Sequence, residues 1–254
     1  MLEGKDGIRS VAIPALALVV ILGLWELADA VFKFNRIILP SPSQIARACV
    51  LNFHVLLSET GVTMFESVLG FLLGSGVAYL LAVAFVHSRT VQEAVYPYAI
   101  ALKSTPLIAV APLLVLWFGN GILSKVVMSA LVAFFPVLVN SVSGLTGIDP
   151  EALDLMKSLS ATRWQILTKI RVPNSLPYLF ASLKIASSLA VVGAVIGEFT
   201  GSIRGVGHLI NTASYYLETP LMFAAIAMIS LGGVLFFWLM AYLEKKVVFW
   251  QEPV

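Results

Sequence analysis

The chain has 254 residues, of which 59% are hydrophobic and only 12% are charged, and its mean hydropathy is +0.94. Ordinary soluble domains carry about 25% charged and about 45–50% apolar residues, so this composition predicts an integral membrane protein instead. The net charge of +2 is too small to indicate a nucleic-acid partner.

Six apolar segments are each long enough to cross a bilayer. A spanning helix needs roughly 20 mostly apolar residues to cross about 30 Å of hydrocarbon, and these runs lack the alternation of barrel strands. We therefore expect an all-α, polytopic membrane protein that forms one transmembrane domain over residues 1–254. The predicted spans are Val11–Phe32, Thr63–Val86, Val95–Trp117, Ile122–Leu145, Pro177–Phe199 and Pro220–Leu243.

The first segment also has features of a secretory signal peptide. Lys5 and Arg9 precede the apolar run, and residues 28–30 (Ala-Asp-Ala) resemble a cleavage site. The run is long, however, and Trp25 and Glu26 lie just before that site. We favour a retained span over a cleaved signal peptide.

Two glycine pairs occur four residues apart within the predicted spans. They are Gly70 with Gly74 and Gly193 with Gly197. Small residues at this spacing let helix backbones approach closely inside a bilayer. We expect these pairs to serve helix packing within the chain rather than a seam between two chains.

Charged residues within spans are costly in lipid and therefore mark functional candidates. Glu66, Lys103 and Lys184 qualify. Either lysine could instead extend to the interface or pair with Glu66. Lys103 stands out because the nearby Pro106 frees backbone carbonyls that could line a cavity. Glu198, at the end of the fifth span, is either a pathway residue or an interfacial carboxylate. The candidate pathway residues are Lys103, Ser104, Thr105 and Glu198.

The distribution of Lys and Arg predicts the orientation of the chain. With the N-terminus in the cytoplasm, nine of the sixteen Lys and Arg residues lie in inside segments and four in outside segments. Because cytoplasmic loops carry an excess of these residues, we expect both termini in the cytoplasm. The amphipathic loop over residues 149–176 then also lies in the cytoplasm.

This loop contains signals for two short helices. Asp149 is a good N-cap and Pro150 suits the first helical position. Glu151 places a negative charge in the first turn, where the helix macrodipole favours it. Residues Thr162 to Gln165 read as a capping box that starts a second helix, which Pro173 is expected to end. The residues on the apolar face of the first helix are Ala152, Leu155, Met156 and Leu159.

The first loop helix could lie on lipid headgroups or fit a groove on a protein. A helix lying on headgroups usually has a strongly basic polar face. Here Glu151 and Asp154 offset Lys157, so the polar face is nearly neutral. This balance favours a protein groove.

The loop resembles the EAA loop of ABC importer permeases. Glu151-Ala152-Leu153 corresponds to E-A-A, and residues 159–162 (LSAT) correspond to the usual L-G-A-S. The closing prolines are Pro173 and Pro177. Leu153 replaces the second alanine and Ser160 replaces the glycine of the turn, which leaves the geometry of that turn in question because glycine allows a positive φ.

Further matches cover nearly the whole chain. They are residues 39–42 (LPSP), 116–119 (LWFG), 194–198 (AVIGE) and 205–210 (GVGHLI). This set resembles the permease branch for nitrate, sulfonates such as taurine, and thiamine-pyrimidine or riboflavin-type compounds.

The resemblance implies a type I importer permease fold in a bacterial cytoplasmic membrane. It implies a second permease copy or paralogue, two ATP-binding subunits that hold ATP and Mg, and an extracytoplasmic solute-binding protein. The chain itself lacks a G-x-x-x-x-G-K-[ST] motif and is not expected to be an enzyme. The implied ATPase-coupling residues are Glu151, Ala152, Leu155, Met156, Leu159, Ser160, Ala161 and Arg163, and Arg204 and His208 are candidates for docking the binding protein.

Two other function classes fit the composition less well. An ion-coupled secondary transporter would show inverted repeats and carboxylates at the bilayer midplane, and neither is visible in the sequence. A membrane enzyme would need paired acids or a histidine cluster, but Asp149, Glu151 and Asp154 are explained as charges at a helix start. Cys49 is the only cysteine and the three histidines are far apart, so we expect no metal site.

Overall fold

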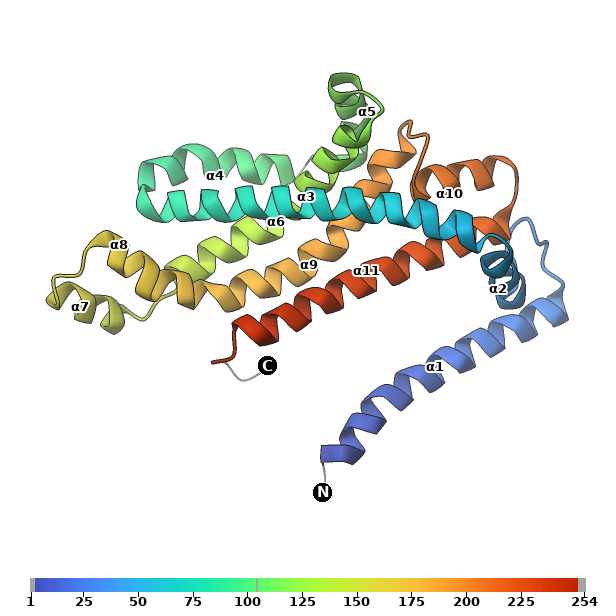
Figure 1. The fold of residues 1–254 in the computed structure, drawn as a ribbon, viewed down its shortest axis with the longest axis horizontal. Helices are drawn as coiled ribbons and strands as arrows, with labels where there is room; N and C mark the ends of the chain where they lie inside the picture. Colours follow the sequence, from blue (N-terminus) through green and yellow to red (C-terminus); the bar gives the residue numbers. More distant parts are fainter. Residues whose placement is uncertain (1–2, 104, 251–254) are drawn as a thin grey trace.

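The computed structural model describes residues 3–103 and 105–250, and this part of the chain is built of helices without strands. Figure 1 shows most of the long helices running side by side along the molecule. The helices are α1 (Glu3–Phe32), α2 (Pro42–Leu51), α3 (Phe53–His87), α4 (Arg89–Lys103), α5 (Leu107–Phe118), α6 (Ile122–Thr146), α7 (Pro150–Ser158), α8 (Arg163–Ile166), the π-helical turn η1 (Leu167–Arg171), α9 (Val172–Phe199), α10 (Val206–Tyr215) and α11 (Thr219–Val247).

Five of the six predicted spans are confirmed as long apolar helical segments. They correspond to Ala12–Phe32, Phe53–His87, Ile122–Thr146, Arg163–Phe199 and Thr219–Val247. The third predicted span is not one helix, because α4 ends at Lys103 and α5 begins at Leu107, with Pro106 as its N-cap. Proline lacks an N–H donor and pushes the residue before it away from helical geometry.

The fifth span starts much earlier than predicted. Helical structure continues from Arg163 to Phe199, so the prediction that Pro173 ends the second loop helix is wrong. The reason is the π-turn, in which the Val172 N–H donates to the Leu167 carbonyl five residues back. A wider turn next to Pro173 accommodates a residue that cannot donate the usual helical hydrogen bond.

α6 forms the centre of the bundle and packs most extensively on α3 and α9. Both glycine pairs lie at these contacts. A Cβ atom at Gly193 would come within 2.8 Å of the Ser129 Cα, and one at Gly197 within 3.2 Å of the Lys125 Cα. Gly70 and Gly74 face α6 from α3 just as closely. The expected role in packing within the chain is confirmed.

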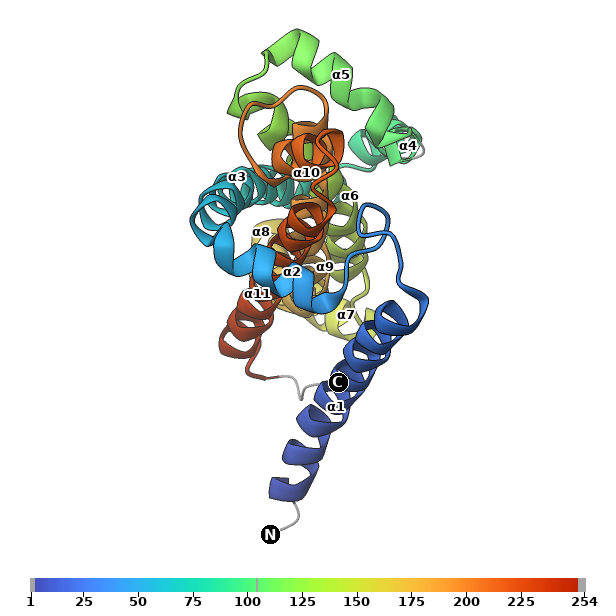
Figure 2. The same ribbon diagram turned by 90° about the vertical axis from the view of Figure 1, so that its right-hand side faces the viewer.

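α1 diverges from the rest of the bundle (Figures 1 and 2), and none of its apolar window Ala12–Phe32 is buried. Only the end near α2 is fastened. There Glu26 accepts hydrogen bonds from the Ser43 N–H (3.0 Å) and the Ser43 hydroxyl (2.7 Å), and Trp25 meets Phe223 edge to face. The exposed length of α1 therefore requires lipid or another chain around it.

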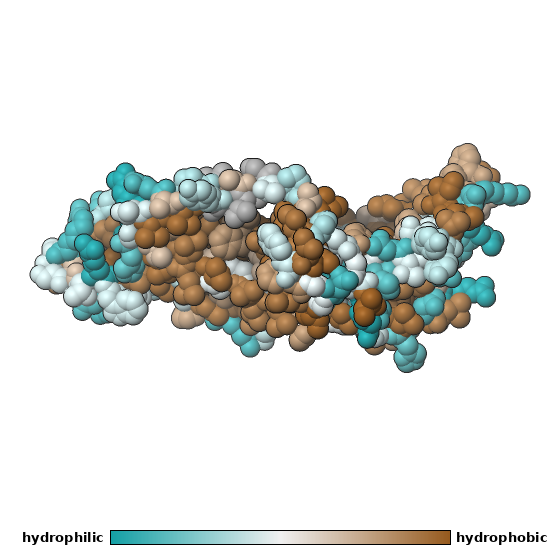
Figure 3. Space-filling model, turned by 90° about the horizontal axis from the view of Figure 1, so that it is seen from above, coloured by the Kyte–Doolittle hydropathy of each residue, from teal (hydrophilic) through white to brown (hydrophobic). Residues whose placement is uncertain are grey.

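The surface is divided into a hydrophobic middle and a more hydrophilic end. In Figure 3, hydrophobic residues cover the middle of the visible face and hydrophilic residues gather at the left end. That end carries α7 and α8, while α2 and the turn between α10 and α11 lie at the opposite end (Figure 1). The amphipathic loop thus lies beyond one end of the long helices.

Candidate functional site

The amphipathic loop, residues 149–176, begins with the capped helix that the sequence predicted. The Asp149 side chain accepts a hydrogen bond from the Glu151 N–H at 3.0 Å, and Pro150 occupies the first turn. Lys157 pairs with Asp154 at 2.8 Å on the exposed surface. α7 therefore gains its local stability from its own cap and charges, since no residue of it is fully buried.

A tight turn after α7 gives Ser160 a left-handed backbone conformation. Its φ is +54°, which answers the question that the missing glycine raised. The Ser160 N–H donates to the Lys157 carbonyl (2.9 Å) and the Ala161 N–H to the Met156 carbonyl (3.0 Å). This pair of bonds is the Schellman motif, so serine makes the turn that glycine usually makes.

The second part of the loop starts with the predicted capping box. The Thr162 N–H donates to Gln165 Oε1 at 2.8 Å, and the Gln165 N–H donates to Thr162 Oγ1 at 3.3 Å. Helical structure then runs without a break into α9. The second part of the loop and the fifth span therefore form one continuous helical segment, Arg163–Phe199.

Two side chains fasten the base of the loop to the end of α6. Asn174 Nδ2 donates to the Gly144 carbonyl at 2.8 Å and to the Gly147 carbonyl at 3.2 Å. Arg171 Nη1 donates to the Leu145 carbonyl at 2.7 Å. These bonds satisfy carbonyls at the end of α6 that the helix leaves free. The loop is therefore attached to α6 as well as to α9.

The tip of the loop presents apolar side chains that nothing in residues 3–103 and 105–250 covers. Leu155 is 61% exposed, Leu159 is 69% exposed and Trp164 is 67% exposed, whereas Ala152 and Met156 are half-buried. Trp164 was not among the predicted residues, although its position two residues after the capping residue Thr162 could have indicated it. Exposed apolar residues grouped in this way are typical of a protein contact surface.

A basic pocket of about 350 Å³ lies beside this tip. Val86, Ile166 and Leu167 form its apolar part. The charged or titratable side chains around it are His87, Arg89, Arg163 and Arg171. No carboxylate lines the pocket, so the predicted coupling residue Arg163 lies in a positively charged surrounding.

The structure places the candidate residues around Lys103 and Lys184 in different surroundings. The side chain of Lys103 and all of Ser104 lie outside the residues that the structure describes. Thr105 is exposed and its hydroxyl donates to the Ala101 carbonyl at 3.3 Å. Lys184 pairs with Glu244 of α11 at 2.6 Å, so the alternative in which it pairs with Glu66 is wrong.

Glu198 is 1% exposed and belongs to a buried polar cluster. Its carboxylate accepts hydrogen bonds from the Thr63 hydroxyl (2.7 Å) and from the Gly207 N–H. Glu66 and Lys125, both buried, lie close enough to interact with it. Sequence reasoning missed Thr63 and Lys125, although a lysine between apolar helical positions was a usable signal.

The predicted docking residues Arg204 and His208 are partly engaged within the chain. Arg204 Nε pairs with Glu59 at 2.9 Å, and its Nη2 donates to the Ser58 hydroxyl at 3.0 Å. His208 Nε2 lies 3.5 Å from the Thr212 hydroxyl in the next turn of α10. Arg204 therefore has a structural contact in addition to any contact with a partner.

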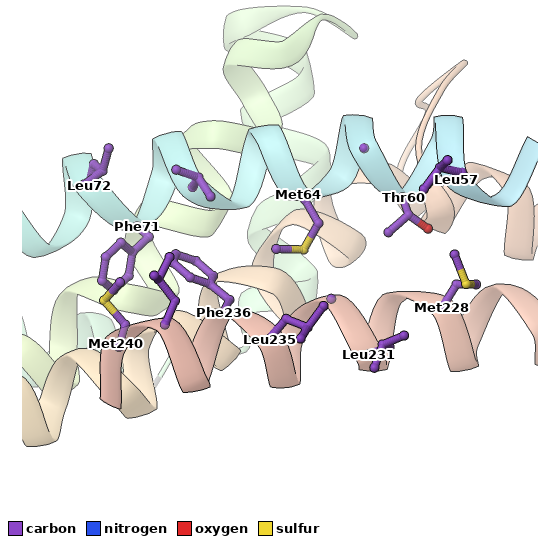
Figure 4. Close-up of a pocket in the computed structure, with 14 residues that line it drawn as sticks. Leu57, Thr60, Met64, Phe71, Leu72, Met228, Leu231, Leu235, Phe236 and Met240 are labelled. Atoms are coloured by element: carbon purple, nitrogen blue, oxygen red, sulfur yellow. The ribbon is translucent and has the colours of Figure 1, made fainter. Parts of the chain in front are cut away.

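A groove of about 690 Å³ runs between α3 and α11 (Figure 4). Apart from Thr60 and two glycines, its walls consist of Leu, Val, Met and Phe side chains such as Met64, Phe71, Leu235 and Met240. It offers no charged group that could bind the polar part of a solute. The groove is therefore a surface for lipid or another apolar helix rather than a polar solute site.

Comparison with known proteins adds the context for this geometry. The profile of the family described as "Binding-protein-dependent transport system inner membrane component" matches residues 67–249. The matched region begins within α3 and extends past α11, so it includes the amphipathic loop and Glu198 with Lys125 and Gly207, whereas Thr63 and Glu66 of the buried cluster precede it.

Three curated relatives match over nearly their whole length. A probable ABC transporter permease of Haemophilus influenzae is 36% identical over 88% of this chain and 92% of the relative. The riboflavin transport system permease RibX of Chloroflexus aurantiacus is 36% identical over 94% of this chain and 91% of the relative. The formylaminopyrimidine transport permease ThiX of Halalkalibacterium halodurans is 32% identical over 94% and 96%.

The fold also resembles a solved transporter. A chain of the MetNI methionine ABC transporter superposes with a TM-score of 0.62 at 18% sequence identity, covering 77% of this chain and 95% of that one. At this identity the likeness supports the fold alone. It agrees with the type I importer permease architecture expected from the sequence.

Proposed function

The chain belongs to the family of binding-protein-dependent transport system inner membrane components and is the permease subunit of an ABC importer; on this premise we propose how it couples ATP hydrolysis to solute movement. Two permease chains act together over two ATP-binding subunits, which hold ATP and Mg. The tip of the amphipathic loop docks in a groove on an ATP-binding subunit. Both chain termini lie on the same cytoplasmic side as this loop.

The observation that carries the proposal is the uncovered apolar tip on a firmly anchored loop. Leu155, Leu159 and Trp164 are exposed at the end of the molecule, while Asn174 and Arg171 fix the base of the loop to α6. A surface that is apolar at its tip and rigid at its base suits a contact that transmits force. The basic pocket beside it favours acidic groups on the partner surface.

The path of the motion follows from the continuous helix. A displacement of α7 acts through the turn at residues 159–162 on α8, and from there on α9, because helical structure is continuous from Arg163 to Phe199. The bonds from Asn174 and Arg171 pass the same displacement to α6. Closure of the two ATP-binding subunits therefore rotates the central helices as bodies and alternates access to the pathway.

The solute is best sought among small heterocyclic compounds. Relatives named for riboflavin and formylaminopyrimidine transport are 36% and 32% identical, whereas those named for aliphatic sulfonates and taurine are 29% and 26% identical. The solute arrives on an extracytoplasmic binding protein that docks at the end carrying α2 and α10, where His208 is a candidate contact. A ligand screen on the cognate binding protein, with taurine as the sulfonate comparison, tests this assignment.

The coupling role is tested by reversing one charge on α7. We expect Glu151→Lys to reduce co-purification of the ATP-binding subunit and to abolish solute-dependent ATP turnover, because a lysine there opposes the dipole at the start of α7 and places an unpaired charge beside the apolar face that docks. Asp154→Lys is the comparison variant, since it makes the same charge change on another side of α7 and in addition breaks the pair with Lys157. Normal assembly and turnover in Glu151→Lys, or equal loss in both variants, would contradict the proposal.

A further inference from the structure

The end of the fifth span is interrupted within the chain and resumes as α10. α9 ends at Phe199, residues 200–205 make a loop, and α10 begins at Val206, lying next to α3 and α9 (Figure 1). The N-cap position is Gly205, which has no side chain to satisfy the first free N–H groups of α10. Those donors must find acceptors elsewhere, because Val206 and Gly207 are buried.

Three side chains from other helices accept these donors in succession. The Gly205 N–H donates to the Glu59 carboxylate of α3. The Val206 N–H donates to the Thr63 hydroxyl oxygen of α3 at 2.8 Å, and the Gly207 N–H donates to the Glu198 carboxylate of α9. The N–H groups of Gly205, Val206 and Gly207 at the start of α10 are therefore all bonded to side chains of α3 and α9.

Thr63 connects the three parts of this arrangement. It is fully buried, and its hydroxyl accepts from Val206 while donating to Glu198 Oε1 at 2.7 Å. One side chain of α3 thus joins α9 and α10. Glu59, one turn earlier on α3, adds the ion pair with Arg204 of the loop at 2.9 Å.

Two glycines make room for the Glu198 side chain. Gly205 has a φ of +95°, and a Cβ there would overlap the Glu198 carboxylate. A Cβ at Gly207 would come within 2.7 Å of the Glu198 Cβ. Such close backbone approach at two positions indicates that the carboxylate and the start of α10 fit only this arrangement.

The positive charges around Glu198 favour a carboxylate at this position. The N-terminus of α10 carries a partial positive charge directed at the carboxylate. Lys125 of α6 lies close enough to interact with Glu198, and its ammonium donates to the carbonyls of Asn120 and Gly121. Gly201 of the interrupted loop packs near the Asn120 side chain. The cluster thus also reaches the loop between α5 and α6.

We propose that Glu198 is a positioning residue for transport: with Thr63 and Glu59 it holds α10 on α3, so that α3, α9 and α10 move together throughout the transport cycle. The role of Glu198 is to hold the interrupted span rather than to line the solute pathway. The inference rests on the proposed function, because it concerns transport by the assembled importer.

The first test replaces Glu198 in the complete importer, reconstituted with its ATP-binding subunits and binding protein. Glu198→Gln loses one accepting oxygen and the charge, so we expect maximal uptake to fall roughly tenfold, the size of effect expected for a buried hydrogen bond left unmade. The binding-protein concentration for half-maximal uptake and the basal ATP turnover should not change. Glu66→Gln is the comparison variant, because it neutralises a neighbouring buried carboxylate but leaves the bonds from Thr63 and Gly207 to Glu198 in place.

A second pair of variants keeps the test decisive if Glu198→Gln does not fold. Thr63→Val keeps the side-chain shape but removes the connecting hydroxyl, and Thr63→Ser restores it. We expect uptake to fall in Thr63→Val and to recover in Thr63→Ser. Wild-type uptake by Glu198→Gln and Thr63→Val, or equal losses in Glu198→Gln and Glu66→Gln, would overturn the positioning role.

A cross-link tests directly whether α10 stays on α3. Ser58→Cys with Arg204→Cys replaces two side chains in contact, in a background with Cys49→Ser. Uptake is compared in the same protein before and after cross-linking with a short bifunctional reagent. We expect it to continue, whereas arrest on cross-linking would overturn the inference. Failure of the proposed function is distinct, because the wild-type importer would then show no ATP-dependent uptake.

Discussion

At the scale of single residues, Ser160 occupies a backbone position that usually selects glycine. A positive φ costs a residue with a Cβ roughly 1–2 kcal/mol, because the Cβ approaches the following carbonyl oxygen. At Ser160 two backbone hydrogen bonds close the turn after α7 and offset this conformational cost. The direction in which α7 projects therefore depends on a strained residue.

Replacing Ser160 with glycine should relieve this strain. We expect Ser160→Gly to slow hydrogen exchange of the Ala161 amide by about fivefold, which corresponds to about 1 kcal/mol of local stability. Ser160→Ala is the control, since it keeps the Cβ and should give no gain. Faster exchange in the glycine variant would contradict the assigned turn geometry.

At the scale of helices, the fifth span shows how a proline can lie inside a helix. Pro173 and Pro177 each predict a boundary, yet the helix continues through both. The π-turn just before Pro173 absorbs the missing hydrogen bond, so the loop and the span are joined rigidly. This continuity joins α8 to α9, and α7 is connected to them through the turn at residues 159–162.

The packing of α9 on α11 includes one ion pair whose removal can be measured. Lys184 and Glu244 lie 2.6 Å apart, and about a quarter of each side chain is exposed. We expect Lys184→Met and Glu244→Met each to lower the free energy of unfolding by about 1–3 kcal/mol, because each leaves one charge unpaired between apolar helices.

The double variant separates this pairing from a role in transport. Lys184→Met with Glu244→Met leaves no unpaired charge, so stability in detergent and solute uptake should both return toward wild type. Stable double-variant protein that fails to transport would instead place Lys184 in the solute pathway.

At the scale of the whole molecule, the position of the amphipathic loop relative to the long helices supports the proposed orientation in the membrane. The loop lies at one end of the bundle, and α2 and the turn between α10 and α11 lie at the other (Figure 1). Lys245 and Lys246 end α11 near the same side as the loop. This arrangement agrees with the excess of Lys and Arg predicted for the cytoplasmic segments.

Reporter fusions test this orientation. A fluorescent protein fused after Val254 should be bright and alkaline phosphatase fused there should be inactive, because the C-terminus is expected in the cytoplasm. A fusion in the turn at Tyr216 should give the opposite pair of results. Phosphatase activity at the C-terminus would contradict the proposed orientation.

The sequence by itself determined the helical membrane fold, the capped helices of the amphipathic loop and the packing role of the glycine pairs. These features depend on local composition, on residues within one turn of each other, or on spacing along one helix face. The family resemblance likewise rested on short contiguous motifs such as residues 151–162.

Only the tertiary structure decided where the polar side chains of separate spans meet. Thr63 and Glu198 are 135 positions apart, and Lys184 and Glu244 are 60 apart, so no local pattern links them. The burial of Glu198 and the capping of α10 by α3 depend on three helices meeting. Even the exposure of Leu155 and Trp164 depends on the absence of a covering helix from the described part of the chain, a property of packing that periodicity cannot supply.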